Sequence, residues 1–146
     1  MYELVLTAHS WLRWAALVAG VMALAMAAAN HNRADRWGLI LVIALDLQFL
    51  LGFALYLVLS PNTQAIFANF GAAMRDPVAR FWAVEHVSLM LFAVVMAHVG
   101  RVLARKATMP AAKRKRLIVC FALSTVAMIA ATPWPGMASG RPLFRV

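Results

Sequence analysis

The chain has 146 residues, of which 64% are hydrophobic and only 13% are charged, a composition that excludes a soluble domain of this length. The formal net charge of +9 does not indicate a nucleic-acid-binding protein, because the basic residues fall almost entirely between the apolar segments. The single cysteine, Cys120, excludes an intrachain disulfide and covalent haem attachment through a Cys-x-x-Cys-His motif. We therefore expect one integral membrane domain over residues 1–146, with lipid as its main partner.

Four long apolar segments predict four transmembrane helices, over residues 4–29, 37–59, 77–103 and 112–133. Segments of this length suit a hydrocarbon core of about 30 Å at a rise of about 1.5 Å per residue. Ser60-Pro61 ends the second helix and Asp76-Pro77 begins the third, because proline disfavours a helical residue before it and is well tolerated at the first helical position. The predicted fold class is an all-α, up-down-up-down four-helix bundle in the membrane.

The connections between the predicted helices differ in charge. Most cations lie in the first and third connections and their flanks: Arg33, Arg36, Arg101, Arg105, Lys106, Lys113, Arg114, Lys115 and Arg116. The second connection and the C-terminal tail hold only Arg75, Arg80, Arg141 and Arg145. Because connections rich in Lys and Arg remain in the cytoplasm, both chain termini are expected on the outer side.

The second connection contains a further helical pattern. Ile66, Phe67, Phe70 and Met74 recur there at helical spacing. This spacing predicts a short amphipathic helix over about 63–75 that lies in the outer interface. Such a helix can be a lid packed on the bundle or can face a substrate.

Polar side chains inside the apolar segments are the main functional signal, because a charged group at mid-depth costs roughly 2.5–3.5 kcal/mol on insertion scales. His9 and His86 lie at similar depth, on helices expected to face each other across the diagonal of the bundle. Two imidazoles in this arrangement can be the axial ligands of one non-covalent b-type haem, or can have a structural or proton-relay role. Gly52 lies at about the same depth, where its missing side chain can admit a porphyrin edge.

The other polar residues allow several interpretations. Arg13 can form an ion pair with Glu85, donate to a haem propionate or reach the outer interface, and Arg80 is an equally suitable propionate partner. Glu85 can also accept a proton if a quinol is oxidised nearby. Asp46 and His98 have comparable depth nearer the inner face and are expected to form a buried pair, either as a proton path or as two polar groups that satisfy each other.

Several motifs suggest a family. They are His9-Ser10-Trp11-Leu12-Arg13-Trp14, Asp46-Leu47-Gln48 followed by Leu51-Gly52, Arg80-Phe81-Trp82 with Glu85-His86, Pro133-Trp134-Pro135, and Arg141-Pro142-Leu143-Phe144-Arg145. Together they resemble small bacterial four-helix membrane proteins labelled cytochrome b or cytochrome b-like. The resemblance implies His9 and His86 as haem ligands and the bacterial cytoplasmic (inner) membrane as the location.

The leading hypothesis is a haem b protein that transfers electrons near the outer face, between a quinone and a partner protein or larger complex. In this role the protein is an electron-transfer component and not a stand-alone enzyme. An alternative is a non-redox accessory or anchor subunit of a larger membrane complex. A small proton-coupled carrier that uses Asp46 and His98 is a third hypothesis.

Overall fold

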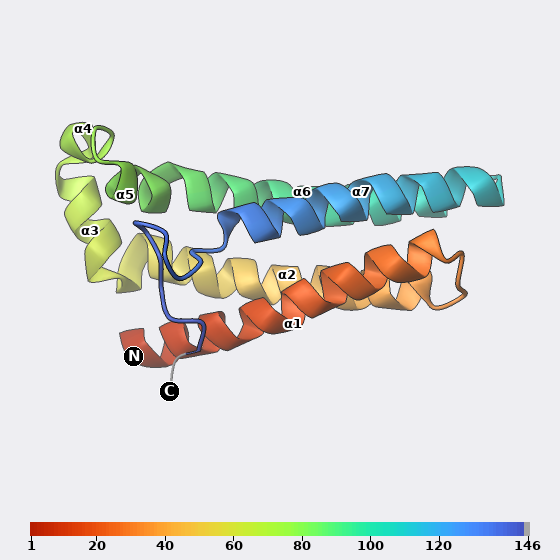
Figure 1. The fold of residues 1–146 in the computed structure, drawn as a ribbon, viewed down its shortest axis with the longest axis horizontal. Helices are drawn as coiled ribbons and strands as arrows, with labels where there is room; N and C mark the ends of the chain where they lie inside the picture. The colour runs from red at the N-terminus through yellow and green to blue at the C-terminus, as the bar shows by residue number, and fades with distance from the viewer. Residues whose placement is uncertain (145–146) are drawn as a thin grey trace.

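The computed structural model describes residues 1–144 and is α-helical, with no strand among those residues. Four long helices lie side by side along the length of the molecule (Figure 1). They are α1 (Tyr2–Ala28), α2 (Ala34–Ala54), α6 (His86–Arg105) and α7 (Pro110–Ala131). The prediction of an all-α fold is therefore confirmed for the described residues. Among the residues named in the sequence-based predictions, Arg145 lies outside them.

The long helices form a square in cross-section. Each packs mainly on two neighbours, in the order α1, α2, α6, α7 and back to α1. Helices α1 and α6 therefore lie on one diagonal and face each other across the centre of the bundle. For His9 on α1 and His86 on α6 to meet in the core, these two helices must face each other in this way.

Small side chains allow the helices to pack closely. Ala23 on α1 and Ala93 and Ala97 on α6 have no exposed surface, and they pack in one core with the fully buried Phe121 on α7. Gly38 on α2 lies against this ring, since a Cβ atom there would be 2.5 Å from Phe121 Cζ. Small residues of this kind are typical of contacts between transmembrane helices, where close backbone approach replaces the burial of large apolar side chains.

Three stretches of the described chain are long and apolar enough to cross a membrane, and they suggest a membrane-embedded protein: Tyr2–Ala28, Ala34–Leu59 and Pro77–Arg105. Large apolar side chains cover their outward faces, as expected for helices in contact with lipid. Helix α7 is not among the three. Its first two turns contain the cations of residues 113–116, so its apolar part is shorter than the helix.

The end of the bundle near the N-terminus is capped by short helices (Figure 1). The π-helix η1 (Leu55–Leu59) ends α2, and α3 (Pro61–Ala68), α4 (Phe70–Ala73), α5 (Pro77–Arg80) and the π-helix η2 (Phe81–Glu85) follow. The single helix predicted over 63–75 is thus two helices. They separate at Asn69, whose φ of −142° is not helical and whose side chain accepts a hydrogen bond from the Ala72 amide at the start of α4.

After α7 the chain folds back over the same end of the bundle to reach α1 (Figure 1). We call residues 133–144 the C-terminal strap. The Leu143 carbonyl accepts hydrogen bonds from Arg13 Nη2 at 2.7 Å and from Trp14 Nε1 at 3.0 Å. Phe144 stacks on the Trp14 ring, with 5.5 Å between the ring centroids. The strap therefore joins the last part of the described chain to the first helix.

Candidate functional site

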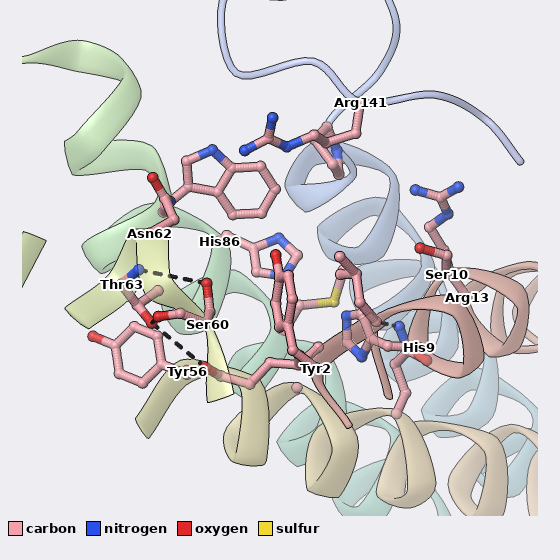
Figure 2. A pocket seen from close by; sticks show the side chains of 17 residues that line it. Tyr2, His9, Ser10, Arg13, Tyr56, Ser60, Asn62, Thr63, His86 and Arg141 are labelled. Atoms are coloured by element: carbon pink, nitrogen blue, oxygen red, sulfur yellow. Dashed lines mark hydrogen bonds between the residues drawn. The ribbon is translucent and has the colours of Figure 1, made fainter. Parts of the chain in front are cut away.

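A cavity of about 120 Å³ lies beneath the C-terminal strap, at the end of the bundle where α3 packs. Figure 2 shows side chains from α1, α2, the capping helices, α6 and the strap around it. A second cavity of about 50 Å³ lies between α2 and α6. Six residues line both cavities and therefore separate them: His9, Gln48, Gly52, Tyr56, His86 and Met90.

The two histidines meet in this separating layer. Their ring centroids are 6.5 Å apart, and their planes make an angle of 67°. His9 comes from α1 and His86 from the first position of α6, so the contact crosses the diagonal of the bundle. The structure thus brings together the two residues that the sequence suggested as a ligand pair.

The orientation of His86 is set by the end of α7. Its Nδ1 lies 2.8 Å from the carbonyl oxygen of Ala131. Because a carbonyl only accepts, Nδ1 carries the hydrogen, and in the neutral ring Nε2 keeps its lone pair. The Ala131 carbonyl is available because the helix ends there and the residue that would donate to it in a continued helix is Pro135, which has no N–H. Histidines that bind metals commonly donate their other nitrogen to a carbonyl in this way.

His9 is less completely paired. Its Nε2 lies 3.2 Å from Nε2 of Gln48, and its buried Nδ1 has no hydrogen-bond partner among the described residues. A Cβ atom at residue 52 would lie 2.9 Å from His9 Cε1, so the missing side chain of Gly52 makes room for the His9 ring. That this glycine also admits a porphyrin edge stays a prediction.

The wall of the larger cavity contains two arginines. Arg13 comes from α1, and Arg141 of the strap lies over the Trp82 ring at 5.2 Å from its centroid. Two buried donors in this wall, Arg13 Nε and Trp82 Nε1, have no hydrogen-bond partner within the described chain. This end of the site therefore offers positive charge and N–H groups to an anionic group. Arg141 was not among the residues that the sequence predicted for the site.

The predicted ion pair between Arg13 and Glu85 is wrong. Arg13 Nη2 donates to the Leu143 carbonyl, and Glu85 accepts a hydrogen bond from Arg80 Nε at 2.8 Å. The Arg80 and Glu85 side chains are about half exposed, and Arg80 does not line the larger cavity. Arg141 takes the position that the sequence analysis gave to Arg80.

Asp46 and His98 form a pair that is separate from the histidine site. His98 Nε2 lies 3.5 Å from Asp46 Oδ2, and neither residue lines the two cavities. The side chains of Asp46 and His98 are 47% and 46% exposed. The expectation of a buried pair is therefore wrong, since the two side chains meet on the outside of the bundle, where α2 and α6 adjoin.

Comparison with protein-family models, with curated proteins and with solved structures finds no match. Within residues 1–144, no group of three or more His, Cys, Asp or Glu side chains lies close enough to hold a metal ion.

Proposed function

We propose that this protein is a membrane-embedded b-type haem protein that transfers electrons near the outer face of the membrane. The observation that carries the proposal is the distance of 6.5 Å between the His9 and His86 ring centroids across the bundle. His9 and His86 would be the two side chains that hold a haem iron, since α1 and α6 bring them side by side from facing helices.

The hydrogen bonds of the two rings are suitable for axial ligation. His86 is held through Nδ1 by the Ala131 carbonyl, which leaves Nε2 for the iron. His9 Nε2 accepts from the amide of the buried Gln48, so His9 would hold the iron through Nε2 only after the Gln48 side chain rotates away.

The two cavities have the polarity that a haem requires. The larger contains Arg13, Arg141 and the Trp82 indole, which suit propionate groups, whereas the smaller is lined mainly by apolar side chains such as Phe49 and Phe53. Their volumes of about 120 and 50 Å³ are well below that of a typical cofactor pocket, which is roughly 300 Å³ or more. Binding therefore requires α2 and α6 to move apart at this end of the bundle.

The charge distribution supports the proposed orientation. The site lies at the end that holds the N-terminus and the strap, whereas the cations of residues 101–116 gather toward the other end of the bundle (Figure 1). We propose that α7 crosses the membrane as a fourth span, that both chain ends face outward and that the membrane is the bacterial cytoplasmic membrane. Haem b would supply reversible one-electron chemistry, with a quinone and a partner protein or complex as exchange partners.

An absorption spectrum of the protein purified from haem-replete cells tests this function. We expect a Soret band, together with an α band that sharpens on reduction. H9A and H86A should each lose most of the bound haem, whereas H98A, which changes a histidine outside the site, should retain it. Circular dichroism of each variant separates loss of haem from loss of fold.

A colourless wild-type protein, or equal haem content in H86A and H98A, would refute the proposal. Should the colourless protein also co-purify with a stable partner and tolerate H9A and H86A, the accessory-subunit hypothesis would replace it.

A further inference from the structure

The pair formed by Asp46 and His98 lies on the membrane-facing surface of the bundle. Asp46 is near the middle of the span Ala34–Leu59, and His98 lies beside it on α6. Residues one helical turn away on the same faces are large and apolar, and they include Ile43, Leu50 and Val95, which are 50%, 64% and 46% exposed. We call this surface of α2 and α6 the seam face. On this surface two polar side chains face hydrocarbon, and neither is buried within the bundle.

The contact between the two side chains leaves hydrogen-bonding capacity unused. His98 Nδ1 lies 3.0 Å from the Val94 carbonyl and must donate to it, so Nε2 is the one ring nitrogen left for an acidic partner. The 3.5 Å between His98 Nε2 and Asp46 Oδ2 exceeds the 2.7–3.2 Å of a normal hydrogen bond. Nε2 can therefore exchange this long contact for a shorter one to another carboxyl group, and the Asp46 carboxyl has further acceptor sites.

The arrangement of acid and base is self-complementary. The acid lies on α2 and the imidazole on the adjacent α6, at the same depth. A two-fold axis along the membrane normal, in front of the seam face, places α2 of one copy opposite α6 of the other. Asp46 then faces His98 of the partner subunit, and His98 faces Asp46 of the partner subunit. Both copies keep the same orientation in the membrane, as their common charge distribution requires.

We propose that the seam face binds a second copy of this chain and that the two Asp46–His98 pairs form the centre of the dimer interface. Four alternating acidic and imidazole groups would then satisfy one another away from lipid, inside a ring of apolar contacts made by side chains such as Leu50 and Val95. This inference rests on the outer surface of the bundle and does not depend on haem binding.

Cysteine cross-linking in native membranes tests the interface directly. In a C120A background, which removes the single cysteine, L50C on the seam face should give a covalent dimer for most of the protein on treatment with a bismaleimide, because the two α2 helices lie diagonally across the interface and too far apart for a direct disulfide. V126C is the matched control, since Val126 is 63% exposed but lies on α7, away from the seam. We expect V126C to remain monomeric on denaturing gels.

Exchange of the two polar residues tests their role. H98D alone should abolish the L50C cross-link, because four carboxylates would face one another. D46H/H98D keeps one acid and one imidazole in each copy and should restore the cross-link. Single-molecule photobleaching in liposomes should show two subunits for the wild type and for the exchange variant, and one for H98D.

Three results would overturn the proposal. They are a single subunit for the wild type, equal cross-linking at L50C and V126C, and a seam face occupied by a different protein or by a lipid-soluble small molecule on a monomer. H98D leaves His9 and His86 unchanged, so the haem content and the number of subunits can be measured separately. A monomeric H98D variant with full haem content would support both proposals, whereas a haem-free wild-type dimer would refute the haem proposal alone.

Discussion

Replacing Gly52 with alanine should weaken the histidine site, because the added methyl group would overlap the His9 ring. The added Cβ would lie 2.9 Å from His9 Cε1, and ordinary contact begins at 3.4 Å, so the imidazole must move by at least about 0.5 Å. This movement would change the position of the His9 ring relative to the His86 ring, whose centroid lies 6.5 Å away. Overpacking of this kind typically costs about 1–3 kcal/mol.

Titration of the haem-free protein with haemin, followed at the Soret band, measures this effect. A cost of about 1–3 kcal/mol corresponds to a haem affinity roughly 5- to 150-fold lower in G52A, with a further loss in G52V. G71A is the control, since no heavy atom lies within 4 Å of a Cβ built at Gly71 in α4. If G52A and G71A bind haemin with equal affinity, then either His9 is not a ligand or its position is not constrained by Gly52.

Two further predictions concern the attachment of the strap and the contact between α6 and α7. R13M keeps the apolar part of the Arg13 side chain but removes its hydrogen bond to the Leu143 carbonyl, which is worth about 1.5–3 kcal/mol. Amides of the strap should therefore exchange with deuterium roughly 10- to 150-fold faster in this variant. Unchanged exchange would mean that Trp14 alone holds the strap. G100A places a Cβ 2.6 Å from Cys120 Cβ and should lower the free energy of unfolding in detergent by about 1–3 kcal/mol. The double variant G100A/C120G should recover part of this loss. If C120G does not compensate for G100A, α6 and α7 are not in close contact here.

Much of the helical architecture could be predicted from the sequence because apolar segment length and proline positions determine it directly. Helix α2 begins at Ala34 instead of 37, and α7 begins at Pro110 instead of 112, which is ordinary uncertainty for helix ends. The π-helical turns η1 and η2 were not predictable, since they depend on tertiary contacts such as the hydrogen bond of 2.6 Å from the Tyr56 hydroxyl to the Ala83 carbonyl.

The candidate site could be predicted only where it depends on helix depth. Counting along two helices was enough to bring His9 and His86 together. It could not assign Arg13 correctly, because the partner is a backbone carbonyl 130 residues away in a strap with no periodic pattern. Nor could it place Asp46 and His98 on the outside, because similar depth does not define the angle at which two side chains leave their helices.

The strap also has a consequence for the order of assembly. In the proposed membrane protein, His9 and Arg13 would enter the membrane with the first helix, whereas the carbonyls that orient His86 and bind Arg13 belong to Ala131 and Leu143. During synthesis the spans can therefore insert long before the site exists. If the proposed haem binds here, we expect it to be loaded after translation. A nascent chain that stalls before residue 131 would contain His9 but would lack the carbonyl that orients His86.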